Sequence, residues 1–328
     1  MTFVESVPAY DRTSTLDIRP FCGKIQVDMA NRINSIFTVE DTFLAYAVGD
    51  NGLALASDDG GATWRKLVLP HRGNLYTISF PGQGDIGYAC GDLGAVLKTE
   101  NGGKTWRLLD TGVHVDLRVI KFRLSPQTGF VAGDAGTVLR TADAGETWVK
   151  LVTATDQKVM DMDFPSDETT GYAVGPNGTI LKTTTGGRIW FSQTGNLQGA
   201  MPSTNITAVF FPNGDSVGFA TTANAGVLFT PDGGEVWRPL PLGFVPPALY
   251  SLDFRRDTME GFVAGAEGTL LHTSDGGETW QRLNVGTTAD LFSIRFFADG
   301  RNGIIAGDER TLLFTTDAGQ TWTPSRIR

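Results

Sequence analysis

The sequence predicts an all-β fold, a seven-bladed β-propeller whose blades are four-stranded antiparallel sheets. Three observations support this prediction. An octapeptide that ends in tryptophan, such as TSDGGETW at residues 273–280, occurs in seven copies. Successive copies are separated by 42, 42, 42, 47, 43 and 42 residues. The units between them contain short runs with the two-residue period of β-strands, and tandem four-stranded units of this length are typical of propeller blades.

The octapeptide uses every tryptophan of the chain, because all 7 tryptophans occupy its last position. The other copies are SDDGGATW (57–64), TENGGKTW (99–106), TADAGETW (141–148), TTTGGRIW (183–190), TPDGGEVW (230–237) and TTDAGQTW (315–322). They end at Trp64, Trp106, Trp148, Trp190, Trp237 and Trp322, and the first-quoted copy ends at Trp280. This regular array indicates one propeller domain of residues 32–328, preceded by an N-terminal extension of residues 1–31.

The strands of one blade follow in order within residues 116–151. The runs LRVIKF (117–122), GFVAG (129–133) and TVLRT (137–141) are rich in β-branched and aromatic residues and alternate in polarity. The octapeptide then forms a turn, and TWVKL (147–151) supplies the fourth strand. Clusters of Gly, Pro, Asp and Asn separate the runs, as tight turns require. The octapeptide turn is therefore expected between strands three and four of every blade.

Two columns of aromatic residues predict the core. The first strands end in a phenylalanine that we expect to pack between neighbouring blades: Phe80, Phe122, Phe164, Phe211, Phe254 and Phe296. The second strands carry a ring at one position, namely Tyr46, Tyr88, Phe130, Tyr172, Phe219 and Phe262, with Ile304 in the seventh blade. Cys90 shares a column with small residues, so we expect a buried thiol rather than a reactive one.

The octapeptide has the chemistry of a stabilised turn. An acid at its third position accepts hydrogen bonds from turn amides, and glycine at its fifth position tolerates a positive φ. The third position holds Asp59, Asn101, Asp143, Asp232, Asp275 and Asp317, and Thr185 in the fourth blade. We therefore expect the fourth blade to have the weakest turn. Since each copy offers at most one carboxylate at this position, we expect neither a calcium ion nor any other metal or cofactor.

Composition excludes several classes of partner. The chain has 328 residues with 27 basic and 36 acidic side chains, a net charge of −9. This balance argues against a broad nucleic-acid interface and against attraction to anionic lipid. No basic segment followed by an apolar run begins the chain, and no stretch of about 18 apolar residues occurs. We expect a cytoplasmic protein as the sequence is written, or a periplasmic or lumenal one if a leader was removed, without direct membrane insertion.

The S/T-x-D-x-G-x-T-W pattern resembles the Asp box of bacterial neuraminidase repeat proteins. The longer phrase GFVAGAEGTLLHTSDGGETW, residues 261–280, is similar to repeats of the photosystem II stability and assembly factor family. The resemblance covers residues 32–328 and implies a binding propeller that holds a partner protein during complex assembly. In families with Asp boxes, which include sialidases and other glycosidases, the box is structural and lies away from the ligand.

Polar residues of the first strands are the first candidate binding residues, because these strands line the channel of a propeller. They are Arg118, Lys121, Asp161, Asp163, Asp253 and Arg295. Two interpretations are open: these side chains bind a ligand, or they pair across the channel and merely solvate it. A second candidate is the pair of loops 192–206 and 240–250, in which Met201, Phe244 and Val245 offer apolar surface for docking.

Two functional classes remain open. One is a non-catalytic assembly factor or scaffold, a monomer that binds a protein or peptide through the inter-blade loop face or the channel. The other is a carbohydrate-active enzyme, such as a sialidase-like glycosidase, or a lectin. A sialidase-type site needs an arginine cluster, a tyrosine nucleophile with a glutamate partner, and an aspartic acid. Three of the six tyrosines fall in the core column, which favours the binding protein, and we assign no catalytic residue.

Closure of the ring has to join blade seven to blade one. The C-terminal TWTPSRIR (321–328) already supplies a fourth strand to blade seven, so the N-terminus does not replace a missing strand. We expect TLDIRPF (15–21) or KIQVDM (24–29) to add an outer strand or to lie across the seam.

Overall fold

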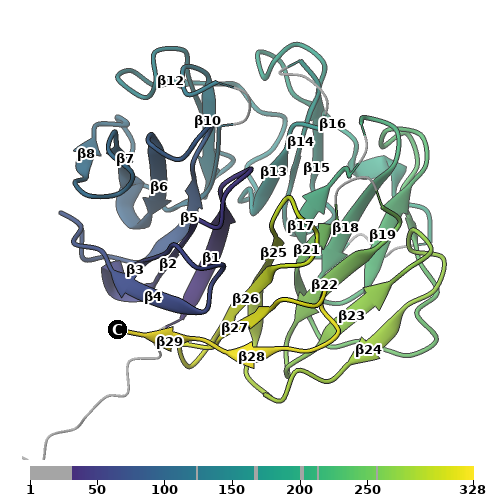
Figure 1. Ribbon diagram of the computed structural model, residues 1–328. Coiled ribbons are helices and arrows are strands. Elements are labelled where there is room, and N and C mark those ends of the chain that lie inside the picture. The colour runs from purple at the N-terminus through teal and green to yellow at the C-terminus, as the bar shows by residue number, and fades with distance from the viewer. Residues whose placement is uncertain (1–31, 123–124, 166–168, 200–202, 213, 256–257) are drawn as a thin grey trace, which may run out of the picture.

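The structure, a computed structural model, describes residues 32–122, 125–165, 169–199, 203–212, 214–255 and 258–328. Within these ranges the chain forms seven antiparallel sheets that surround a central axis as blades (Figure 1). Each blade follows the sequence, from an innermost first strand to an outermost fourth strand. The predicted seven-bladed β-propeller is confirmed.

The strand bounds repeat from blade to blade. The first strands are β1 (Ile33–Thr38), β5 (Leu75–Ser79), β9 (Leu117–Phe122), β13 (Asp161–Asp163), β17 (Ile206–Phe210), β21 (Leu249–Phe254) and β25 (Leu291–Phe296). The second strands are β2 (Ala45–Gly49), β6 (Gly87–Gly91), β10 (Gly129–Gly133), β14 (Gly171–Val174), β18 (Gly218–Thr222), β22 (Gly261–Gly265) and β26 (Gly303–Gly307).

The outer half of each blade is shorter. The third strands are β3 (Ala54–Ser57), β7 (Val96–Thr99), β11 (Val138–Thr141), β15 (Ile180–Thr183), β19 (Val227–Thr230), β23 (Leu270–Thr273) and β27 (Leu312–Thr315). The fourth strands are β4 (Thr63–Lys66), β8 (Arg107–Leu109), β12 (Val149–Lys150), β16 (Phe191–Ser192), β20 (Arg238–Pro239), β24 (Gln281–Leu283) and β28 (Thr323–Pro324). The described residues add short 3₁₀ turns at Asp50–Gly52, Asp92–Gly94 and Thr194–Asn196, and a last strand, β29 (Arg326–Ile327).

Three aromatic rings fill each boundary between consecutive blades from the first to the seventh. Tyr46 of blade one stacks on Phe80 of blade two with 3.7 Å between ring centroids. Phe80 in turn meets Trp106 edge-on at 6.0 Å. The same arrangement recurs in Tyr88–Phe122–Trp148, Phe130–Phe164–Trp190, Tyr172–Phe211–Trp237, Phe219–Phe254–Trp280 and Phe262–Phe296–Trp322. The two predicted aromatic columns are therefore the two sides of one contact between blades, and each ring pair stabilises it by about 0.5–1.5 kcal/mol beyond its buried area.

The octapeptide closes its own turn with a fixed set of hydrogen bonds. In blade six, Thr273 Oγ1 donates to Asp275 Oδ1 at 2.7 Å and accepts from Gly277 N at 2.9 Å. Asp275 also accepts from the backbone N–H of Thr279 at 2.9 Å and from its hydroxyl. These hydrogen bonds lower the pKa of Asp275 to about 2, and the bond from the Thr279 hydroxyl has the largest effect. The carboxylate therefore stabilises the turn at neutral pH and loses this effect as the pH falls through about 2.

The octapeptide of blade four has a threonine in place of the carboxylate acceptor. Thr185 accepts from Ile189 N at 3.0 Å, and its own hydroxyl lies 3.3 Å from that of Thr183. The bond that the Thr279 hydroxyl makes to Asp275 in blade six has no counterpart here, because Ile189 has no hydroxyl and Thr185 has no carboxylate. In blade five Val236 also lacks a hydroxyl, but Asp232 still accepts from the Val236 N–H at 3.0 Å. That blade four has the weakest of the seven turns stays a prediction.

The fifth residue of the octapeptide also touches the preceding blade. A Cβ at Gly187 would lie 2.3 Å from Cε1 of Phe130, and one at Gly61 would lie 2.7 Å from Cγ1 of Ile304. The fourth residue is less constrained, since Ala144 and Ala318 occupy it with φ values of 59° and 64°. Glycine is therefore required at the fifth position by the neighbouring blade as well as by its own φ.

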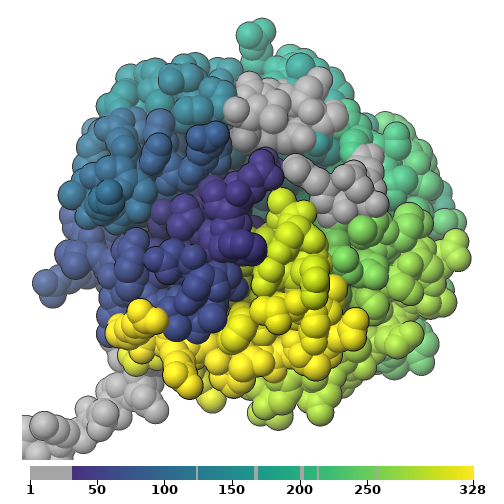
Figure 2. All heavy atoms as spheres, in the orientation of Figure 1, coloured from purple at the N-terminus to yellow at the C-terminus, as the bar shows by residue number. Residues whose placement is uncertain are grey.

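The boundary between blades seven and one is held differently. Thr38 and Ile304 stand where the other boundaries have rings. The chain crosses this boundary instead: β29 leaves blade seven and pairs in parallel with β4 of blade one (Figure 1). Arg326 N donates to Ala62 O at 3.0 Å, and Arg328 N donates to Trp64 O at 2.8 Å. In Figure 2 the C-terminal atoms, in yellow, lie directly against those of blade one.

The C-terminal segment TWTPSRIR (321–328) thus contributes a strand to each of two blades, β28 to blade seven and β29 to blade one. This corrects its assignment to blade seven alone. Pro324 ends β28, and the residues after it turn toward blade one, where Ser325 Oγ donates to Gly61 O at 2.6 Å. The segments TLDIRPF and KIQVDM, which we expected at the seam, lie outside the described residues.

Gly61→Ala is expected to lower the free energy of unfolding by about 2–4 kcal/mol, because the new Cβ overlaps Ile304 across the seam. Urea denaturation followed by tryptophan fluorescence measures the loss. Gly60→Ala is the matched control in the same turn: its φ is +74° and the nearest neighbouring atom lies 3.7 Å from the added Cβ. The control should lose less than about 1 kcal/mol. Equal losses in the two variants would contradict the inter-blade role of the fifth position.

Deletion of residues 325–328 is expected to destabilise the ring by about 2–4 kcal/mol, since three hydrogen bonds between blades seven and one disappear. Thermal and urea unfolding midpoints should both fall. Arg326→Ala keeps the backbone bonds and is expected to stay within about 0.5 kcal/mol of the parent. An unchanged midpoint in the deletion variant would show that β29 does not tie the ring.

Candidate functional site

The first strands border a cavity of about 520 Å³ at the channel end where they turn into the second strands. Five of the predicted binding residues line it: Lys121, Asp161, Asp163, Asp253 and Arg295. They come from the first strands of blades three, four, six and seven. Alternate residues of each first strand face the channel. In an antiparallel blade this end also carries the octapeptide turns. The cavity therefore opens on the face opposite the inter-blade loops.

The acids of the channel bind the backbone of the next blade. Asp161 Oδ2 accepts from Val209 N at 3.1 Å, and Asp163 Oδ2 accepts from Phe211 N at 2.9 Å. Asp253 Oδ2 accepts from Phe296 N at 2.7 Å. A first strand is a sheet edge, and its inward amides have no partner strand. These acids supply the missing acceptors, a role that neither sequence interpretation included.

Asp253 is the most deeply buried of the three acids, with 8% of its surface exposed. Burial raises the pKa of this carboxyl to about 6, although Arg295 and the hydrogen bond from Phe296 favour the ionised form. With this raised pKa, Asp253 becomes charged as the pH rises through about 6.

Three cations line the cavity: Arg255 pairs with Glu260, whereas Arg295 and Lys121 have no ion pair within the described ranges. One terminal nitrogen of Arg295 donates to Leu252 O at 3.2 Å and to Ile294 O at 2.7 Å. Lys121 has no ion-pair partner within the described ranges. The rings of Phe37 and Phe210, which the sequence argument did not select, complete the wall. Phe37 and Phe210 occupy the first-strand position that Lys121 occupies in blade three, and this shared position could have identified them from the sequence. The cavity can accept an apolar group beside an anionic one.

Arg118 lies away from this cavity. It is near the start of β9, whereas Lys121 is near its end, so the two side chains reach opposite ends of the channel. Its guanidinium donates to Asp134 at 3.0 Å and to Asp116 at 3.1 Å, and it lies 4.4 Å from the ring centroid of Tyr76. Tyr76 donates to Asp92 in the same cluster. Arg118 therefore orders the inter-blade loop face.

The predicted loop patch is only partly described. Val245 is 94% exposed and Phe244 40% exposed, and neither lines the channel cavity. Met201 lies outside the described residues. Part of the long loop packs on the edge of blade five, where Gln198 N donates to Trp237 O at 2.8 Å. This segment covers blade five as β29 covers blade one, and Trp64 and Trp237 are both fully buried.

Cys90 is fully buried, as predicted, and burial raises the pKa of its thiol to about 12. No group of three or more His, Cys, Asp and Glu side chains in the described ranges could hold a metal ion. Among the same residues, no helix is long and apolar enough to cross a membrane.

Asp253→Asn is expected to flatten the pH dependence of stability. In the parent, the folded-state pKa near 6 lies above the unfolded value of about 3.9, so the free energy of unfolding falls as pH rises through this window. The variant keeps an oxygen for the Phe296 N–H but carries no charge. At pH 8 it should be more stable by up to about 3 kcal/mol, with the difference vanishing near pH 4. Urea denaturation across this range measures it, and a constant difference at all pH values would contradict the assignment.

Solved structures similar to this chain share its fold. A structure of YCF48 bound to D1 peptide has 24% sequence identity and a TM-score of 0.69, over 87% of this chain and 93% of that chain. YCF48 from Cyanidioschyzon merolae has 20% identity and a TM-score of 0.69, over 87% and 95%. The GH74 enzyme of Niastella koreensis has 14% identity and a TM-score of 0.72, over 89% of this chain and 53% of the enzyme. At these identities the likeness concerns the fold alone.

The comparison with curated proteins gave no match. Protein-family models gave a match in four overlapping segments, residues 21–115, 62–154, 149–248 and 244–328. Together these segments include every blade. The chain therefore belongs to the family described as photosynthesis system II assembly factor YCF48.

Proposed function

We propose that this chain is a non-catalytic, protein-binding propeller that acts as an assembly or stability factor. The observation that carries the proposal is the family match, which extends over residues 21–328. A solved relative of the same fold holds a D1 peptide, which supports peptide binding as the mode of action of this chain too. The partner is a protein segment, and the propeller holds it without changing it chemically.

The proposed docking region is the channel mouth on the octapeptide face. Its cavity of about 520 Å³ is large enough for a few side chains of an extended segment. Lys121 and Arg295 offer positive charge to an acidic residue or a chain terminus, while Phe37 and Phe210 offer apolar surface. Asp161, Asp163 and Asp253 already accept backbone amides of the next blade, whereas Lys121 has no ion-pair partner in the described ranges.

The test is capture of a partner by tagged protein from a lysate of the source organism, with crosslinking and mass spectrometry. The parent chain should enrich a defined protein, crosslinked near the channel mouth. Lys121→Glu reverses the charge of a side chain without an ion-pair partner in the described chain, so it should fold normally and lose most of this capture. Lys66→Glu, the same charge change on the exposed outer strand β4, is the matched control and should retain it.

Two results would contradict the proposal. One is the absence of any partner that the parent enriches over a control bait. The other is hydrolysis of fluorogenic glycosides by the purified chain at a rate above background, which would favour the carbohydrate-active alternative.

A further inference from the structure

The fourth strands form the outer rim of the ring, and within the described ranges two of them are covered by another segment of the chain (Figure 1). In blade one β29 pairs in parallel with β4 and places Ile327 opposite Trp64. In blade five Leu197 forms a parallel bridge with Trp237. In both blades the carbonyl of the tryptophan accepts a backbone N–H of the covering segment at 2.8 Å. A covered edge thus receives an aliphatic residue opposite the octapeptide tryptophan, between polar neighbours.

The other five fourth strands have no partner on their outer side among the described residues. Alternate residues of such a strand turn their N–H and C=O groups outward. In blade one Leu67 N donates inward to Ala54 O at 2.9 Å, so Trp64 and Lys66 are the residues whose backbone groups face outward. The outward positions of every blade are therefore the tryptophan and the residue two places after it.

The second outward position decides how well an edge is protected. Unpaired edges invite pairing with other chains, and proteins block them with charged residues or with proline. In all seven blades this position lies opposite a leucine of the third strand. It is occupied in chain order by Lys66, Leu108, Lys150, Ser192, Pro239, Arg282 and Pro324.

Leu108 of β8 is the exception in this column. Five of the other six residues are lysine, arginine or proline, and the sixth is a serine. The Leu108 side chain is 54% exposed. β8 is also three residues long, whereas the fourth strands that carry proline have two. Blade two therefore has an uncovered edge with an aliphatic residue where the other blades have a polar residue or proline.

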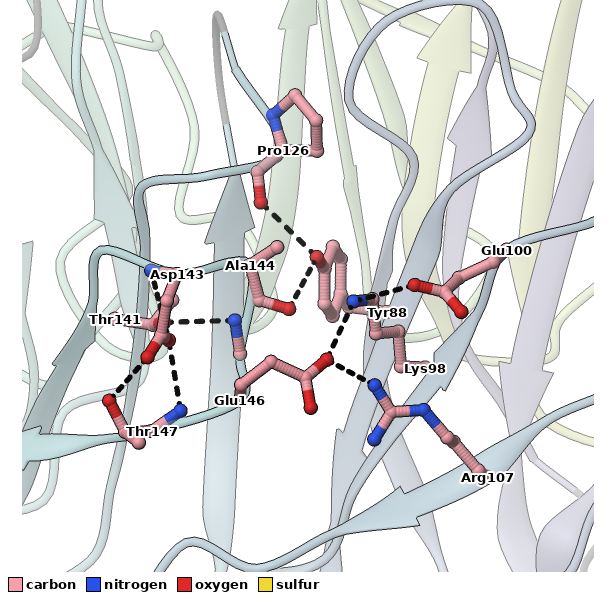
Figure 3. A network of polar contacts seen from close by, with 11 residues as sticks. Tyr88, Lys98, Glu100, Arg107, Pro126, Thr141, Asp143, Ala144, Glu146 and Thr147 are labelled. Carbon is pink, nitrogen blue, oxygen red and sulfur yellow. Dashed lines mark hydrogen bonds and ion pairs between the residues drawn. The ribbon is translucent and has the colours of Figure 1, made fainter.

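The charged residue next to Leu108 is already paired (Figure 3). Arg107 pairs with Glu146 of blade three, and Lys98 Nζ of β7 lies 3.0 Å from the same carboxylate and 2.9 Å from Glu100 Oε1. These pairs join β8 and β7 to blade three. Leu108 and the outward backbone groups are thus left for a partner, without an unpaired charge in β8 itself.

We propose that the outer edge of β8 binds an extended segment of a partner protein as a fifth strand, parallel to β8. The occupant carries an aliphatic residue opposite Trp106 and polar residues on either side, as the two covering segments of this chain do. Main-chain hydrogen bonds provide affinity, and the contact with Leu108 provides preference for this blade. Trp106 is 9% exposed, whereas Trp64 and Trp237 beneath their covering segments are fully buried. The inference rests on protein binding as the function and adds a contact on the rim, away from the channel mouth.

The test uses a synthetic peptide with the sequence of residues 320–328, QTWTPSRIR, in which photo-leucine replaces Ile327. The peptide is irradiated with the full-length chain, and mass spectrometry locates the crosslinks, which should concentrate in residues 104–110. Leu108→Pro removes the outward N–H and Leu108→Lys adds a charge, so each should lower the yield there by at least about fivefold. Both variants should fold normally, because other blades hold proline and lysine in this column.

Arg282→Pro is the matched control, since it removes the same outward N–H from blade six. The yield at residues 104–110 should then change by less than about twofold. Arg282→Leu is the converse variant: it gives blade six the aliphatic residue of blade two and should produce a second crosslinked region around residues 278–284. The absence of this region would contradict the role assigned to Leu108.

Other outcomes would also overturn the inference. Crosslinks spread evenly over the uncovered blades would mean that the peptide does not distinguish β8, and crosslinks confined to residues 62–66 would mean that it only replaces β29. An unchanged yield in Leu108→Pro would place the peptide elsewhere. A dimer of the parent chain that Leu108→Pro dissociates, measured by sedimentation, would assign the edge to a second copy. Crosslinking that appears only after deletion of residues 1–31 would assign it to the N-terminal extension.

Partner capture separates this inference from the proposed function. A parent chain that crosslinks the peptide at β8 but captures no protein contradicts the proposed function. A chain that captures a protein but gives no crosslink at β8 contradicts only the rim contact.

Discussion

The contact between a second-strand ring, the next first-strand phenylalanine and the octapeptide tryptophan is the interaction on which the molecule depends. The blades are sheets of short strands, and their fourth strands extend over only two to four residues. Such a sheet is marginal alone and needs packing on a neighbour. The octapeptide provides both requirements, since it closes its own turn by hydrogen bonds and sets a glycine and a tryptophan against the preceding blade. A change in one octapeptide therefore acts on two blades.

The ring also has an inner edge, and this edge explains the chemistry of the channel. The first strands have no inward neighbour, so their amides require acceptors from side chains. Asp161, Asp163 and Asp253 meet this requirement across blade boundaries. Lys121 and Arg295 line the same cavity and favour the ionised form of Asp253. A structural need of the fold thus accounts for the acids of a mixed-charge channel.

Repetition makes departures from the pattern informative. At the seam, Thr38 and Ile304 replace the rings, and the chain compensates with the parallel pairing of β29 on β4. At the boundary between blades three and four, Arg188 stands where two other boundaries have a glutamate, and the Arg140 guanidinium lies 6.0 Å from the ring centroid of Phe130. The first departure is resolved within the chain and is structural. The second leaves Nε of Arg140 without a hydrogen-bond partner among the described residues.

The sequence by itself determined the number of blades, the order of strands, the turn chemistry and the two aromatic columns, because each depends on periodicity within one repeat. Five of the six charged first-strand residues that it selected line the channel cavity, since alternation in a first strand decides which side chains face inward. Only the tertiary structure decided which residues meet across blades. Asp253 and Phe296 are 43 residues apart, β29 joins opposite ends of the chain, and Arg118 differs from Lys121 only in its depth along the channel. These contacts depend on the angle and register between blades, which no pattern within a single repeat encodes.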